Sequence, residues 1–250
     1  MCEQCGNLQH ERDPRMSRRT FVGTAAIAPF ALWTAALARA AEPPAAGSAP
    51  PANAIPPSES FKRLMEGNAR YAANSPNQRD FSSGRAARTE GQYPIAAILS
   101  CADSRVAPEL AFDQGPGDLF VVRVAGNIVT TNLLASLEYG VQFLGVPLIM
   151  VLGHSRCGAV DAAIKVLKSK AALPGHLPEL VASIKPAVIV AERTQSGDLL
   201  DNAIAENVRR QVGKLKNSPP VIASFYASKK IDIVGGVYDL ATGKISVLGT

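Results

Sequence analysis

Several features are scarce in this 250-residue sequence, and each scarcity excludes a class of protein. Four cysteines are too few for a disulfide scaffold, and the only long apolar run lies near the start, which excludes a polytopic membrane protein. Aromatic residues make up 6% and charged residues 19%, so the chain is neither disordered nor a repeat of aromatic blades. The net charge of +5 falls to +3 without the first 41 residues, which argues against a nucleic-acid partner.

The first 41 residues have the features of an export signal. Arg18 and Arg19 precede a moderately apolar run over 24–38, and residues 38–40 place small side chains at the two recognition positions for cleavage. This pattern is similar to a twin-arginine signal and predicts export to the bacterial periplasm, with no stable membrane span after cleavage. A retained membrane anchor or a buried helix is the alternative. Met16 is a second candidate for the start of the chain.

The composition divides the chain into three parts. Residues 1–41 form the leader, and the proline- and alanine-rich segment 42–57 predicts an extended linker. Residues 58–250 are long enough for one ordinary domain, in keeping with a hydrophobic content of 47%. Cys2 and Cys5 form a C-x-x-C motif inside the leader, and because no second ligand pair accompanies them we assign them no function.

Strand and helix patterns alternate from residue 58 onward. Helices are expected from Ser58 to the region of Tyr71 and over 131–144, 159–169, 179–193 and 199–214. Strands are expected over 95–100, 119–124, 148–152, 221–226, 231–238 and 245–248. This order predicts an α/β fold with a central, mostly parallel β-sheet flanked by helices. In such sheets functional residues gather beyond the carboxyl ends of the strands.

Two of these strand ends carry residues that can bind a metal ion. The run 95–100 leads into Cys101, and the run 148–152 leads into a loop with His154 and Cys157. If the strands are neighbours, two thiolates and one imidazole converge, a set that suits zinc and leaves a fourth position open. A redox pair of the two cysteines, or ordinary burial of each residue in the core, is the competing interpretation.

The same residues carry a resemblance to a known family. A C-x-D-x-R motif begins at Cys101, and an H-x-x-C-G motif begins at His154. Together with the segments 116–123, 137–139 and 236–243, these motifs resemble the β-class carbonic anhydrases over essentially all of residues 58–250. The resemblance implies an enzyme that hydrates carbon dioxide reversibly to bicarbonate and a proton through zinc-bound hydroxide.

Roles for five residues follow from the resemblance. Cys101, His154 and Cys157 would bind one zinc ion per chain. Asp103 and Arg105 would form a catalytic dyad, in which the arginine keeps the carboxylate ionised and oriented. In the closed state known for the family, Asp103 itself takes the fourth zinc position.

Further positions match substrate-binding residues of the family. Gln92 would donate a hydrogen bond to a substrate oxygen, Phe120 and Tyr139 would line a small apolar pocket, and Gly158 would stand beside the last zinc ligand. Core packing is the plain alternative for each. Ile98 stands where family members with a regulatory bicarbonate site carry tryptophan, which places the chain in the plant-like, open-site branch.

The resemblance also implies a homodimer or a higher homo-oligomer. The pocket would be completed by a neighbouring subunit, and the helix from Ser58 would pack on that subunit. His176, the other imidazole after the leader, is expected in a surface loop. Hydrolysis of a carbon dioxide analogue such as carbonyl sulfide or carbon disulfide is one alternative function, and a non-catalytic zinc or thiol protein is another.

Overall fold

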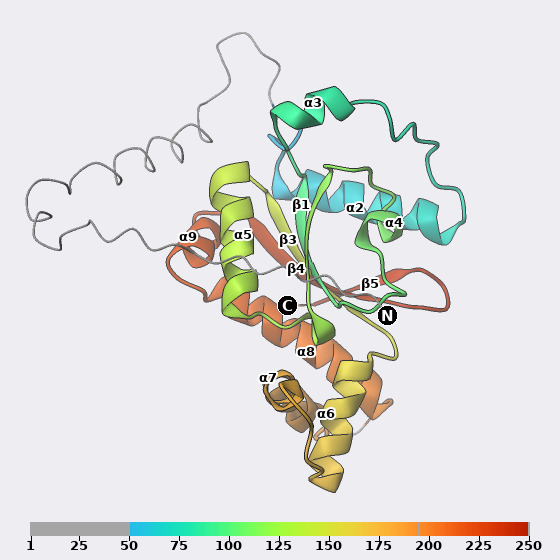
Figure 1. The fold of residues 1–250 in the computed structure, drawn as a ribbon, viewed down its shortest axis with the longest axis vertical. Coiled ribbons are helices and arrows are strands. Elements are labelled where there is room, and N and C mark those ends of the chain that lie inside the picture. Colours follow the sequence, from blue (N-terminus) through green and yellow to red (C-terminus); the bar gives the residue numbers. More distant parts are fainter. Residues whose placement is uncertain (1–50, 195, 250) are drawn as a thin grey trace, which may run out of the picture. The chain divides into compact units, whose positions relative to one another are not determined.

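The computed structural model describes residues 51–194 and 196–249, which form an α/β fold around a five-stranded sheet (Figure 1). The strand order is β2-β1-β3-β4-β5, with the first four strands parallel and β5 antiparallel to β4. The strands are β1 (Ala96–Ser100), β2 (Leu119–Arg123), β3 (Leu148–His154), β4 (Asp232–Tyr238) and β5 (Ile245–Leu248). The expected fold class is therefore confirmed.

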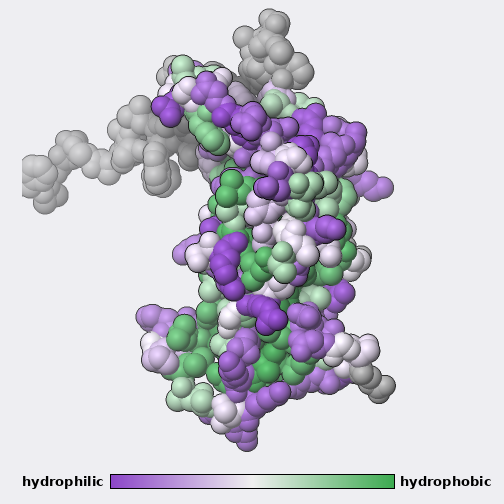
Figure 2. Space-filling view, turned by 90° about the vertical axis from the view of Figure 1, so that its right-hand side faces the viewer, coloured by the Kyte–Doolittle hydropathy of each residue, from purple (hydrophilic) through white to green (hydrophobic). Residues whose placement is uncertain are grey.

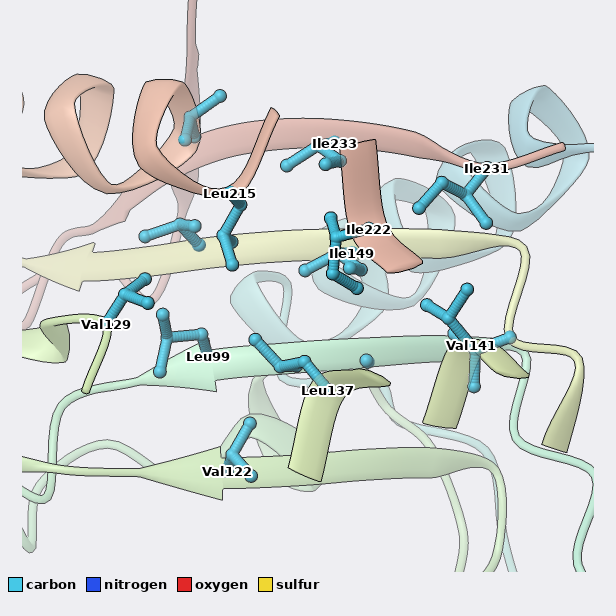
Figure 3. Close-up of a cluster of buried hydrophobic side chains, with 14 of the residues drawn as sticks. Leu99, Val122, Val129, Leu137, Val141, Ile149, Leu215, Ile222, Ile231 and Ile233 are labelled. Atoms are coloured by element: carbon cyan, nitrogen blue, oxygen red, sulfur yellow. The ribbon is translucent and has the colours of Figure 1, made fainter. Parts of the chain in front are cut away.

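The two central strands are apolar on both faces because helices cover the sheet from both sides. All residues of β1 and β3 are buried, as expected of strands inside a parallel sheet. One face is covered by α5 (Thr131–Leu144), α8 (Leu199–Lys216) and α9 (Val221–Ala227), and the other by α2 (Pro57–Ala72) and the short α4 (Pro108–Ala111). Figure 3 shows the first of these two cores, where side chains of the sheet meet Leu137, Val141, Leu215 and Ile222 from the helices.

Two more helices build a separate layer beside α8. The helices α6 (Gly158–Ser169) and α7 (Leu177–Ala191) lie side by side against α8 and away from the sheet (Figure 1). Their shared apolar cluster includes Cys101 and Cys157, so the two cysteines lie where this layer joins the sheet. A short helix, α3 (Arg85–Glu90), is exposed along its whole length. In the described part of the chain, none of the helices combines the length and apolar character of a membrane span.

The strand expected over 221–226 is wrong, because this segment forms helix α9. Its short apolar run fits either structure by pattern alone. In the structure Ile222 is fully buried, and Phe225 and Tyr226 pack against the same core, a spacing that matches one face of a helix. Pro220 occupies the N-cap position directly before this helix.

The first described helix begins one residue earlier than expected and has no side-chain cap. Helix α2 starts at Pro57, and no side chain caps it. Ser60 instead donates a hydrogen bond of 2.6 Å to the carbonyl oxygen of Ile95, which ties the helix to the start of β1. Contacts begin even before the helix, because the buried Asn53 donates a hydrogen bond to Leu144 O.

Asn68 fixes α2 to two other elements. Its Nδ2 atom donates hydrogen bonds to Ala111 O at 2.9 Å and to Gly243 O at 2.8 Å. Its Oδ1 atom accepts a hydrogen bond from the N–H of Ile245 at 2.9 Å, the first residue of β5. A buried amide with all three bonds made costs little on folding and orders α4, β5 and α2 together.

Candidate metal centre

The metal-binding candidates come from three neighbouring chain segments. Cys101 follows the last residue of β1, and His154 is the last residue of β3. Because Ser100 pairs with Leu152 in the parallel register of β1 and β3, both residues lie at the carboxyl edge of the sheet. Cys157 is the N-cap of α6, three residues beyond His154. The chain reversal between β3 and α6 thus brings the second cysteine back to the strand ends.

The three side chains form one compact group of ligand atoms. The sulfur atoms of Cys101 and Cys157 and a ring nitrogen of His154 all lie within 4.8 Å of one another. The two sulfurs are 4.0 Å apart, far more than the roughly 2.05 Å of a disulfide, so both cysteines are free thiols. Two sulfurs at about 2.3 Å from one zinc ion, in tetrahedral geometry, stand about 3.8 Å apart. The donor set and its spacing therefore fit zinc.

The surroundings of His154 leave one ring nitrogen free to bind a metal ion. The ring is fully buried, and Nδ1 lies 3.0 Å from the carbonyl oxygen of Ser155. A proton on Nδ1 can bond to that oxygen, which leaves the lone pair on Nε2. Among residues 51–194 and 196–249, Nε2 has no hydrogen-bond partner. A buried nitrogen of this kind is costly unless an ion occupies the adjacent space.

The two thiols differ strongly in acidity. A hydrogen bond from Cys157 lowers the pKa of Cys101, against the opposing effect of burial, and the N–H of Gly126, 3.2 Å from the sulfur, lowers it further. The hydrogen bond to Cys101 and burial both raise the pKa of Cys157. Metal binding requires both cysteines as thiolates, so a divalent cation would displace the protons that they hold.

A carboxylate held by an arginine borders this group. Arg105 donates to Asp103 through Nε at 2.9 Å and Nη2 at 2.8 Å, and its backbone N–H adds a third bond at 3.0 Å. These hydrogen bonds hold the pKa of Asp103 well below its ordinary value. The Oδ2 atom of Asp103 lies 3.8 Å from His154 Nε2, so an ionised, oriented acceptor faces the ligand atoms.

Comparisons with known proteins agree with this geometry. The family model described as "Carbonic anhydrase" matches residues 96–245. The chain is 38% identical to a carbonic anhydrase of Mycolicibacterium smegmatis over 192 residues, which cover 76% of this chain and 93% of the relative. It is 39% identical to carbonic anhydrase 2 of Mycobacterium tuberculosis (H37Rv) over 189 residues, which cover 75% and 91%.

Solved structures give the class. The β-carbonic anhydrase of Coccomyxa in complex with acetazolamide superposes with a TM-score of 0.60 at 28% identity, covering 76% of this chain and 85% of that one. The chain belongs to the β-class carbonic anhydrases. A tetrameric β-carbonic anhydrase of Sordaria macrospora gives a TM-score of 0.60 at 25% identity, covering 77% and 98%. The chain is accordingly a lyase that hydrates carbon dioxide and uses zinc.

Three expected substrate-binding residues of this carbonic anhydrase lie away from the ligand group within one chain. Phe120 pairs in register with Ala97, four residues before Cys101, which is about 13 Å along the strand. Tyr139 on α5 stacks beside Phe120 with ring centroids 6.4 Å apart. Gln92 is exposed and precedes β1. The three residues therefore lie toward the amino edge of the sheet, opposite the ligands.

The glycine that the site requires is Gly126, which the sequence reasoning missed. Gly126 has φ +71°, and a Cβ on it would come within 2.6 Å of Ile184 Cδ1. Gly158 is exposed at the start of α6, and among the described residues no atom lies within 4 Å of a Cβ placed there. The left-handed backbone and the contact with the Ile184 side chain therefore favour glycine at position 126, and neither applies to Gly158. Gly126 lies in an Ala-Gly-Asn segment shortly after β2, and a glycine at such a place was the sequence signal for a tight turn.

Proposed function

We propose that this carbonic anhydrase hydrates carbon dioxide at a single zinc ion held by Cys101, His154 and Cys157, with Asp103 and Arg105 as its catalytic dyad. The observation that carries the proposal is the buried Nε2 atom of His154. It has no hydrogen-bond partner in the described parts of the chain, stands beside two free thiols, and faces an ionised carboxylate at 3.8 Å. One divalent cation satisfies all of these groups at once.

The dyad supplies orientation. Arg105 engages both oxygens of Asp103, so the carboxylate cannot rotate and remains an acceptor at all physiological pH values. An acceptor at this place takes the hydrogen bond of the attacking water and thereby directs the lone pair of the water toward the carbon of carbon dioxide. The ion, when bound, makes hydroxide available near neutral pH by lowering the pKa of water.

The donor set predicts an alkaline pH dependence. Two thiolates give the ion more negative charge than three imidazoles, so it activates water less strongly than the best zinc sites, which reach a pKa of about 7. We expect the rate of carbon dioxide hydration to rise between pH 6 and pH 9, to vanish after zinc is removed by a chelator, and to return with added zinc. Stopped-flow measurements check this, and a flat profile over that range contradicts it.

The remaining substrate contacts are assigned to a neighbouring subunit. We propose a homodimer or higher homo-oligomer in which Gln92, Phe120 and Tyr139 of one chain face the zinc ligands of another, and in which α2 packs on its neighbour. Two exposed aromatic rings support this arrangement. Tyr139 is 41% and Phe143 40% exposed, and their ring centroids lie 5.5 Å apart, so they form an exposed apolar patch of the kind that a neighbouring subunit covers. Figure 2 views another side of the molecule, the one that carries α2 and α4 in Figure 1, and shows apolar surface among its polar side chains.

We assign the chain to the plant-like, open-site branch. Ile98 is fully buried in β1 at the position where a tryptophan would accompany a regulatory bicarbonate site. Asp103 is engaged by Arg105 through both oxygens, and this pairing favours the state in which the carboxylate leaves the fourth metal position open.

Export is the proposed route of the protein to its place of action. The segment with Arg18 and Arg19 lies outside the described residues, so the proposal rests on the sequence. A twin-arginine route moves folded proteins, and zinc bound in the cytoplasm would protect Cys101 and Cys157 from oxidation. We expect zinc-loaded protein in the periplasmic fraction, and replacing both arginines by lysine should retain it in the cytoplasm. Periplasmic protein that holds only an oxidised, zinc-free cysteine pair contradicts the proposal.

A further inference from the structure

Two buried amide side chains and one exposed lysine lie along one side of α8. Asn207, Gln211 and Lys214 are spaced so that they lie on one side of the helix, between apolar residues that pack on the sheet. Asn207 is 1% and Gln211 5% exposed. Buried amides on a helix are costly unless they are fully bonded, so their partners indicate their purpose.

All three side chains bond to one short segment, residues 126–129. Asn207 Nδ2 donates to Gly126 O at 2.8 Å, and Lys214 Nζ donates to Val129 O at 2.8 Å. Gln211 Oε1 accepts the N–H of Val129 at 2.9 Å, and Gln211 Nε2 donates to Asn207 Oδ1 at 3.2 Å. We call these three residues the α8 ladder. It holds both ends of the segment to the helix.

The held segment reaches the metal centre through one hydrogen bond. The N–H of Gly126 donates to Cys101 Sγ at 3.2 Å. The backbone at Gly126 is in the left-handed region, and the space where a side chain would stand is filled by Ile184. The N–H and the carbonyl group of Gly126 belong to the two peptide planes that meet at its Cα atom. Asn207 holds the second plane through the carbonyl oxygen, and with the backbone conformation at Gly126 this restricts the direction of the N–H.

We propose that Asn207 and Gln211 are positioning residues for the metal centre. They fix the backbone on the carboxyl side of Gly126, so that the N–H of Gly126 hydrogen-bonds to the Cys101 sulfur and limits the charge that this sulfur donates to the ion. Hydrogen bonds of this kind around a ligating sulfur tune the electronic properties of the metal and orient the ligand. The inference rests on the proposed zinc site and extends it to a helix that contributes no ligand.

The test compares Asn207→Leu with the control Asn68→Leu. Both asparagines are buried and bond to backbone groups, but Asn68 lies in the other layer. We expect Asn207→Leu to lower zinc affinity about 10- to 100-fold, measured by competition with a chromophoric chelator. In the cobalt(II)-substituted protein, the sulfur-to-cobalt charge-transfer band should move to longer wavelength. Asn68→Leu should unfold at lower urea concentration, with zinc affinity within about twofold of wild type and an unchanged band.

A second variant keeps the test decisive if Asn207→Leu does not fold. Gln211→Met removes the support of Asn207 and of Val129 but leaves the bond from Asn207 to Gly126 O, so a smaller change in the same direction is expected. Wild-type affinity and an unshifted band in the folded variants would overturn the inference while leaving the zinc site intact. Failure of the wild-type chain to bind either metal would overturn the zinc site itself, and the inference with it.

Discussion

Replacing His154 by glutamine is expected to abolish zinc binding and to reduce carbon dioxide hydration to the rate of the buffer. The Nε2 atom of His154 is buried and has no hydrogen-bond partner in the described parts of the chain. Glutamine offers no equivalent metal-ligating nitrogen beside the two thiols. Loss of a direct ligand should exceed the roughly 100-fold loss in affinity typical for an outer partner of a metal ligand. Zinc content after dialysis and stopped-flow hydration measure the two effects.

The chain provides a matched control for this variant. His176 is exposed and is the N-cap residue of α7, as expected for a surface position. His176→Gln should keep both wild-type zinc content and wild-type activity. An equal loss in both histidine variants, or one zinc ion per chain in His154→Gln, would contradict the assignment of His154 as a ligand.

Replacing Asp103 by asparagine is expected to separate catalysis from metal binding. The amide keeps the shape of the carboxylate but loses the charge that Arg105 engages, so it orients the attacking water poorly. We expect kcat to fall about 100- to 10,000-fold, the range for a positioned proton-handling group, while zinc content stays at one ion per chain. Asp161→Asn, at an exposed carboxylate paired with Lys165, should change neither quantity. Normal turnover by Asp103→Asn contradicts the role of the dyad.

The same variant tests whether the site is shared between subunits. Asp103→Asn and Gln92→Leu should each be impaired alone. When equal amounts of the two variants are dissociated and reassociated together, half of the dimers contain one chain of each variant. If Gln92 acts on the neighbouring chain, each of these heterodimers holds one intact site. About a quarter of wild-type activity is then expected, since a two-fold interface places the same residues on both sides. No recovery on mixing would contradict the shared site.

The zinc ligands could be predicted from the sequence because their placement follows from simple rules. The runs before Cys101 and His154 carry apolar residues on both faces, which indicates central parallel strands. The carboxyl ends of such strands meet at one edge of the sheet, and two motifs at neighbouring ends bring their side chains together. The structure confirms this convergence within 4.8 Å.

Other features depend on contacts that no local pattern carries. The apolar run at 221–226 suits a strand or a helix, and only the core around Ile222 decides for α9. The α8 ladder resembles an ordinary polar stripe facing solvent, since its partner Gly126 lies 81 residues from Asn207. The pairing of Phe120 with Ala97 likewise emerges only from the register of the sheet.

Carbon dioxide hydration by the zinc-loaded chain near pH 8.5, followed by stopped flow beside Cys101→Ser, tests the central claim most directly. We expect fast turnover with one zinc ion per chain, and neither turnover nor tight zinc binding in the variant. Fast turnover that survives in zinc-free Cys101→Ser would contradict the metal mechanism. A wild-type chain with one bound zinc ion and no turnover would contradict carbon dioxide as the substrate, and carbonyl sulfide would then be assayed.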